Sequence, residues 1–216
     1  MKKSPSQRNS EMIRELLAFH KEKKEAIRKR LEEFSRVSPN DYFYELLYCL
    51  MTPQSSAENA EKAVALLRQL DFEQNVLDPE SVLRNKHHYI RFHRTKAKHL
   101  LKAKEDLPSL LQALRDGSSS LELREWTVRH IKGLGYKEAT HFLRNIGKND
   151  GLAILDRHIL RNLKRYGAIR SIPRTISRKQ YFRIEQRFIE FSQRIDIPLD
   201  ELDLLFWSLE TGEIRK

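Results

Sequence analysis

The chain has 216 residues and a formal net charge of +11, with 41 Lys and Arg against 30 Asp and Glu. Its 39% of hydrophobic residues can bury a core, and only seven Gly and seven Pro exclude a collagen-like or Gly/Pro-rich disordered chain. The single cysteine, Cys49, excludes an internal disulfide and any four-cysteine zinc or iron–sulfur site, and its apolar neighbours predict that it fills core.

The basic charge predicts a polyanionic partner, and nucleic acid is the usual one. The first residues are charged rather than apolar, and no stretch approaches the roughly 18 apolar residues that a membrane span needs. We therefore expect a soluble, cytoplasmic protein of a reducing compartment that has no membrane partner.

Apolar residues recur at helical spacing along the chain, and no alternating strand pattern competes. The sequence predicts an all-α protein of roughly ten helices joined by short loops. Ser55 and Ser56 are expected to cap a helix, and Pro79 to open a short one. The longer helices are expected over 11–34 (frayed before Ser10), 41–51, 57–70, 94–101, 107–114, 121–131, 136–146, 156–166, 177–194 and 199–209.

The most informative stretch is the turn Lys132-Gly133-Leu134-Gly135 between two predicted helices. Glycines permit a positive φ and a close backbone approach, and the turn can aim its amides and the next helix N-terminus at a phosphate. The pattern is typical of a helix-hairpin-helix that binds the DNA backbone. An ordinary turn between helices, with glycines as breakers, would have the same pattern.

Two charged residues follow this turn. Lys137 lies in the first turn of a helix, where the macrodipole disfavours positive charge, and a neutral amine is the form that attacks carbon. Asp156 follows four apolar residues and starts a helix, where its carboxylate can stabilise positive charge that develops on a sugar. The simpler interpretations are a surface lysine on a basic protein and a plain helix cap.

Together, the hairpin, Lys137 and Asp156 resemble the helix-hairpin-helix DNA glycosylase superfamily. The strings over 137–145 and 156–160 resemble its archaeal-type (second) family of 8-oxoguanine DNA glycosylase/AP lyases, which also occurs in some bacteria. The resemblance spans most of the chain. It implies a two-lobed all-α fold, with Lys137 as nucleophile, Asp156 as the invariant aspartate, and Gly133, Gly135 and His158 as DNA-backbone contacts.

Two further positions follow from the resemblance. The stretch 50–57 is similar to a loop of endonuclease III-like enzymes whose glutamine fills the gap left by an extruded nucleotide, which makes Gln54 a candidate. Phe92 falls where the superfamily places an apolar wedge, and an inserted ring partly offsets the unstacking cost of flipping a base. The alternatives are a plain loop glutamine and a core phenylalanine.

The C-terminal stretch 206–216 resembles the short family tail that ends in lysine. In that family the tail folds back to the base pocket, which implies that Trp207 contacts the base and that Lys216 contributes its terminal carboxylate. A core tryptophan is the alternative for Trp207.

Some residues depart from the superfamily pattern. Lys132 stands where proline is usual, so the turn is less rigid. The iron–sulfur cysteines of endonuclease III are absent, and we expect no counterpart of the extra N-terminal domain of the eukaryotic 8-oxoguanine enzymes. The histidines have no metal-site spacing, so we expect no metal site and no required cofactor. Hairpins of this kind often hold a monovalent cation on their carbonyls, and the sequence leaves that point open.

We therefore expect a six-helix lobe over 37–150 that contains the hairpin (131–146), and a second lobe formed by 1–36 and 151–216. The resemblance implies a monomeric, bifunctional enzyme that excises 8-oxoguanine from duplex DNA by lysine Schiff-base chemistry and cuts the strand by β-elimination. The alternatives are a glycosylase for another damaged base, a non-catalytic module that binds the DNA backbone, and a basic RNA-binding protein. The absent cluster cysteines argue against the first, and the lysine–aspartate pair argues against the other two.

Overall fold

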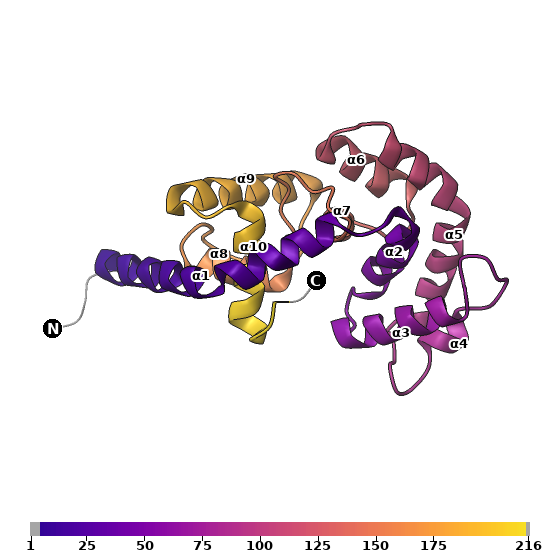
Figure 1. Cartoon of the computed structure of the whole chain (residues 1–216). Coiled ribbons are helices and arrows are strands. Elements are labelled where there is room, and N and C mark those ends of the chain that lie inside the picture. The colour runs from indigo at the N-terminus through magenta and orange to yellow at the C-terminus, as the bar shows by residue number, and fades with distance from the viewer. Residues whose placement is uncertain (1–4, 215–216) are drawn as a thin grey trace. The chain divides into compact units, whose positions relative to one another are not determined.

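The computed structural model describes residues 5–214, and every regular element in that range is a helix (Figure 1). The chain divides into two compact units, Val37–Lys148 and the pair of segments Met1–Arg36 and Asn149–Lys216. The first unit therefore ends two residues before the expected boundary at 150. We call these the middle unit and the terminal unit.

The middle unit is built around one apolar helix. Helix α2 contacts α3, α5 and α7, and eight of its ten residues are buried, among them the fully buried Cys49. It is central because its sequence is apolar on nearly every side. The elements of this unit are the 3₁₀ turn η1 (Pro39–Asp41), α2 (Tyr42–Met51), α3 (Ala57–Gln69), α4 (Glu80–Leu83), α5 (His93–Arg115), α6 (Ser120–His130) and α7 (Tyr136–Asn145).

Serine caps set the starts of two of these helices. The Ser56 side chain accepts the N–H of Asn59 at the start of α3, as expected. Ser119 and Glu122 form a reciprocal capping box at the start of α6. These side chains satisfy amides that have no partner inside the helix.

Helix α5 corrects one expectation, because the segments 94–101 and 107–114 form one helix with Pro108 inside it. Proline donates no N–H, so the carbonyl of Lys104 loses its helical partner beside the exposed Pro108. The helix continues because one apolar stripe packs along both halves. The buried residues of this stripe are Ala97, Leu100, Ala103, Leu107, Leu110 and Leu114.

The terminal unit is organised around α10. Phe206 stacks on Tyr166 and Phe188, with ring centroids 5.6 and 5.8 Å apart. The unit contains α1 (Pro5–Ser35), α8 (Arg157–Arg165), α9 (Arg178–Ile195) and α10 (Leu199–Thr211). Helix α1 begins at Pro5 and not near Glu11 as expected, since proline is favoured in a first helical turn.

A buried carboxylate connects α1 to α10. Glu201 is 5% exposed, and its two oxygens bind His20 Nε2 at 2.6 Å and Arg28 Nε at 2.8 Å. Burial alone would raise the pKa of Glu201, but the hydrogen bonds from Arg28 and His20 outweigh it and lower that pKa. The pair of bonds holds the helix that carries Trp207.

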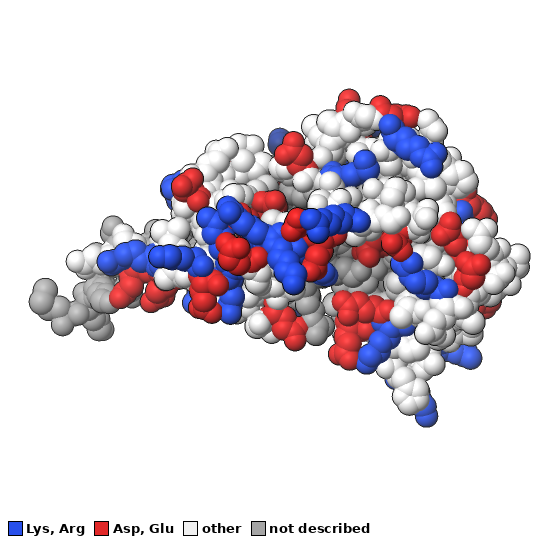
Figure 2. All heavy atoms as spheres, in the orientation of Figure 1, with Lys and Arg blue, Asp and Glu red and all other residues white. Residues whose placement is uncertain are grey.

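Charged side chains cover α1. On the face drawn in Figure 2, Lys and Arg side chains lie along this helix and are interspersed with Asp and Glu. Lys21 and Lys29 are exposed, so the charged residues around them lie on a solvated face of α1. Across residues 5–214, no helix combines the length and the apolar character that a membrane span requires.

Candidate active site

The turn between α6 and α7 contains two glycines, and one of them has the positive φ that the sequence analysis associates with such a turn. Gly133 has a φ of +99°, and a Cβ built on it would lie 2.4 Å from Nδ1 of His99 on α5. Gly135 is the N-cap of α7 with an extended backbone, so it requires no positive φ. Burial, with the nearby charge of Lys132, lowers the pKa of His99. A neutral imidazole therefore packs against Gly133 at neutral pH.

We expect the Gly133→Ala substitution to destabilise the middle unit, because it combines a strained φ with a collision against the His99 ring. The matched control is Gly117→Ala, where φ is +71° and no atom lies within 4 Å of the added carbon. Urea denaturation should show a loss of about 1 kcal/mol for the control and a clearly larger loss for Gly133→Ala. Equal losses would mean that His99 yields to the methyl group.

Lys137 is the second residue of α7. Its side chain is 24% exposed, and its Nζ lies 3.9 Å from Oε1 of Glu138. Within residues 5–214 no hydrogen bond engages this Nζ. The lysine is thus mostly covered, and its amine is not used in a structural hydrogen bond.

Asp156 caps α8, and it is also held from a second helix. Its Oδ1 accepts the N–H of Ile159 at 2.8 Å, and its Oδ2 accepts the Nε1–H of Trp207 at 2.7 Å. The plain-cap interpretation therefore covers only one of the two oxygens. Because each carboxylate oxygen has two lone pairs, each can still accept a further bond.

The apolar stretch before Asp156 is anchored to α9. The N–H of Ala153 donates to Oε1 of Glu185 at 2.9 Å, and the hydroxyl of Tyr181 donates to the carbonyl of Ala153 at 2.6 Å. Glu185 and Tyr181 are themselves buried. Asp156 consequently stands at the end of a segment that is fixed by hydrogen bonds as well as by packing.

His158 and Trp207 lie side by side near Asp156. Their ring centroids are 5.0 Å apart, and Nδ1 of His158 is 3.6 Å from Oε2 of Glu210. Trp207 is half-buried and hydrogen-bonded to Asp156, so it is not a plain core residue. A base contact by Trp207 and a phosphate contact by His158 stay predictions, and Lys216 lies outside the described residues.

Gln54 and Phe92 occupy exposed positions with unusual backbones. Gln54 has a φ of +56°, and Phe92, the N-cap of α5, has a φ of +60°. Phe92 is 50% exposed, so the interpretation as a core phenylalanine is wrong. Both residues belong to the middle unit and present their side chains to solvent.

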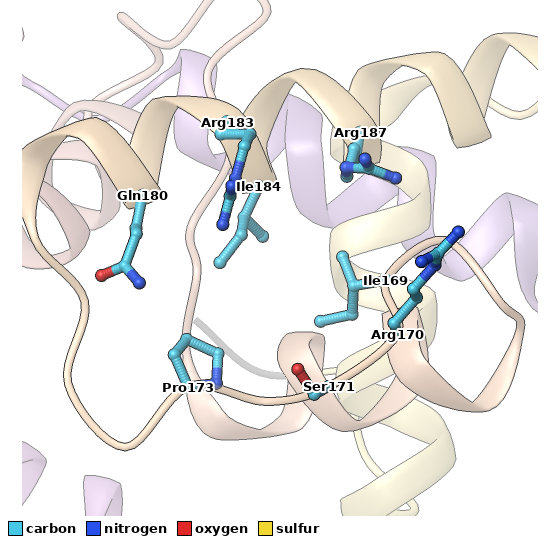
Figure 3. A pocket seen from close by; sticks show the side chains of 8 residues that line it. All are labelled: Ile169, Arg170, Ser171, Pro173, Gln180, Arg183, Ile184 and Arg187. Carbon is cyan, nitrogen blue, oxygen red and sulfur yellow. The ribbon is translucent and has the colours of Figure 1, made fainter.

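The terminal unit also carries a basic pocket of about 430 Å³ that the sequence analysis did not identify (Figure 3). Arg183 and Arg187 extend from α9, and Arg170 extends from the segment after α8. Ile169 and Ile184 supply apolar lining. Within residues 5–214 these three guanidinium groups form no ion pair, so their charge is available to an anion.

Among residues 5–214 no group of three or more His, Cys, Asp and Glu could hold a metal ion. That the histidines bind no metal stays a prediction. That no cofactor is required, and whether the hairpin carbonyls hold a monovalent cation, stay predictions.

The family model described as 8-oxoguanine DNA glycosylase matches residues 27–197. The chain belongs to the 8-oxoguanine DNA glycosylase family. The resemblance noted in the sequence is thereby confirmed, and so is the expected all-α, two-lobed fold class.

Similar family members cover nearly the whole chain. An 8-oxoguanine DNA glycosylase/AP lyase of Fusobacterium nucleatum is 38% identical over 97% of this chain and 100% of its own length. One of Korarchaeum cryptofilum is also 38% identical, over 89% of this chain and 91% of its own.

Two solved structures of the 8-oxoguanine DNA glycosylase family have the same fold. The enzyme of Thermotoga maritima matches with a TM-score of 0.84 at 31% identity, covering 96% of this chain and 100% of that one. The glycosylase/lyase of Methanocaldococcus jannaschii, solved with a 15mer DNA containing 8-oxoguanine, matches with a TM-score of 0.85 at 34% identity. That match covers 95% of this chain and 99% of the other.

Besides the basic pocket, two features of this 8-oxoguanine DNA glycosylase family member were not predicted from the sequence. One is the hydrogen bond from Trp207 to Asp156, and the other is the buried ammonium of Lys96, 6% exposed in the first turn of α5. Neither has a local pattern, because both depend on partners that are distant in sequence. A lysine at a position that continues an apolar helix stripe is the one available signal for Lys96.

Proposed function

We propose that the chain is a bifunctional DNA repair enzyme that excises 8-oxoguanine from duplex DNA and then cuts the strand. The observation that carries the proposal is similarity over almost the full length to 8-oxoguanine DNA glycosylase/AP lyases, one of which was solved with DNA containing 8-oxoguanine. We further propose that it acts as a monomer on cytoplasmic, nucleoid-associated DNA, because one chain carries both proposed catalytic residues.

Two residues supply the chemistry in this proposal. The amine of Lys137, after losing a proton, attacks C1′ of the sugar, and the bond from C1′ to the base breaks as the base leaves with the electron pair and gains a proton. Asp156 stabilises the positive charge that builds up on the sugar during this step. The sugar ring then opens to a Schiff base on Lys137. Loss of the C2′ proton breaks the bond from C3′ to its phosphate.

Duplex binding supplies access to the lesion. The amides of the turn at Gly133 and Gly135, the imidazole of His158 and the positive surface would bind phosphates and release counterions. Gln54 and Phe92 would enter the duplex where the damaged nucleotide leaves it, because an extruded base must be replaced in the stack. Their exposure and their left-handed backbones support this assignment.

Borohydride trapping on a panel of duplexes tests the proposal. Borohydride reduces a Schiff base to a stable bond, so a covalent protein–DNA adduct should form strongly on 8-oxoguanine and not on the undamaged duplex. Thymine-glycol and abasic duplexes complete the panel. An adduct on the abasic duplex alone would leave a lyase with a different lesion, and intact duplex binding with no adduct would indicate a non-catalytic module.

A further inference from the structure

Lys96 has a role in the structure that the proposed mechanism does not use. Its Nζ donates to the carbonyls of Met51 and Pro53 at 2.6 and 2.7 Å, and to Oγ of Ser55 at 3.2 Å. Met51 is the last residue of α2, and Pro53 and Ser55 lie in the loop between α2 and α3. An ammonium has three N–H donors, so these three bonds use every donor of the buried Lys96 side chain.

Burying this ammonium is costly, and the loop offsets the cost. Burial lowers the pKa of Lys96 to about 8, against a smaller opposing effect of the Glu138 carboxylate. The amine is therefore still protonated at neutral pH. A buried charge is tolerated when hydrogen bonds replace its hydration, and here two carbonyls and one hydroxyl do so.

Ser55 extends the contact to a second loop. Its Oγ accepts the N–H of Arg91 at 3.0 Å as well as the bond from Lys96. Arg91 directly precedes Phe92, and Ser55 directly follows Gln54. The amide Nδ2 of Asn59 adds a bond to the carbonyl of Tyr89 at 3.1 Å. The two loops that carry Gln54 and Phe92 thus share one hydrogen-bonded cluster.

The backbones of Gln54 and Phe92 explain why such a cluster is needed. Among residues 5–214 four non-glycine residues have a positive φ, and the two besides Gln54 and Phe92 are aspartates, which tolerate this region better. A left-handed residue of another type persists only where its surroundings impose it. The hydrogen bonds of Lys96 to Pro53 and of Arg91 to Ser55 fix the residues on both sides of Gln54 and the residue before Phe92.

We propose that Lys96 and Ser55 are positioning residues that hold Gln54 and Phe92 ready to enter the duplex when the damaged base is extruded. We call Lys96, Ser55 and the carbonyls of Met51 and Pro53 the Lys96 cluster. The proposal rests on the proposed function. It predicts that the cluster matters for extracting a stacked base and not for the chemistry that follows.

The test compares two substrates that differ in how firmly the lesion is paired and stacked in the duplex. One is a full duplex with a paired 8-oxoguanine, and the other places the same lesion in a one-nucleotide bulge, where extrusion costs less. Lys96→Met should slow single-turnover base release from the full duplex by about tenfold, because the two strained backbones are no longer held. Release from the bulge should change by no more than about twofold. Lys98→Met, an exposed lysine on the same helix, is the matched control.

A milder variant keeps the test decisive if Lys96→Met fails to fold. Ser55→Ala removes one hydroxyl from a half-buried loop residue and should show the same difference between substrates, and Ser55→Thr should restore the rate. Equal slowing on both substrates, or no slowing on either, would overturn the proposal. Such a result would make the cluster a structural support only.

A second readout separates this proposal from the proposed function. A 2-aminopurine beside the lesion fluoresces when its neighbour leaves the stack, and it reports extrusion without requiring base release. If the unmodified protein released no 8-oxoguanine, the proposed function would fall. The fluorescence change of the Lys96→Met variant against that of Lys98→Met would still decide the role of the cluster.

Discussion

The Lys137→Gln variant is expected to lose both base release and strand cutting, by more than about a thousandfold, or roughly 4 kcal/mol of transition-state free energy. The reason is that glutamine has no amine lone pair with which to form the bond to C1′. The side chain of Lys137 is 24% exposed and lies 3.9 Å from the carboxylate of Glu138, so glutamine fits without opening a cavity. Single-turnover assays on an 8-oxoguanine duplex, with borohydride trapping alongside, measure the loss.

The control for Lys137→Gln is Lys98→Gln, which removes one positive charge from an exposed position in the same unit. Both variants should bind undamaged duplex within a few-fold of the unmodified protein, since each removes at most one phosphate contact. Full activity or a retained covalent adduct in Lys137→Gln would refute the assignment of the nucleophile. A matching loss in Lys98→Gln would assign the effect to charge.

The Asp156→Asn variant is expected to slow base release by about a hundredfold to a thousandfold while duplex binding is retained. Asparagine caps a helix nearly as well as aspartate, so α8 should still begin at Arg157. The variant loses the negative charge that is proposed to stabilise the positive charge building up on the sugar. Single-turnover base release measures this loss, and fluorescence anisotropy measures duplex affinity.

A structural consequence of Asp156→Asn must be separated from the loss of charge. The Nε1–H of Trp207 now donates to Oδ2 of Asp156, and an asparagine amide placed there would present a donor to a donor. Trp207→Phe removes that donor and leaves the carboxylate, so it should keep far more activity than Asp156→Asn. Asp196→Asn, an exposed residue of the same unit, controls for a one-unit change in net charge. A normal turnover rate in Asp156→Asn would exclude the proposed role.

Local patterns in the sequence determined most of the helices. Apolar spacing defines a helix without reference to the rest of the chain, and the predicted serine cap at position 56 marks a helix start that the structure confirms. The helices differ from the expected ones at two places, the start of α1 and the joined helix α5, and both differences have one cause. A proline by itself is compatible with either the start of a helix or a break in one. At Pro5 first-turn geometry makes it the start of α1, and at Pro108 tertiary packing keeps it inside α5.

The sequence by itself also predicted which residues the chemistry needs, because the family motif places Lys137 and Asp156 at recognisable positions relative to the glycine turn. Only the tertiary structure decided how three of the residues are held. The indole of Trp207 reaches Asp156 from another helix, Phe92 is exposed rather than buried, and Lys96 is buried beneath the loop of Gln54. Each of these depends on packing between segments that are far apart in the chain, and a hydrogen bond between such segments leaves no periodic trace in the sequence.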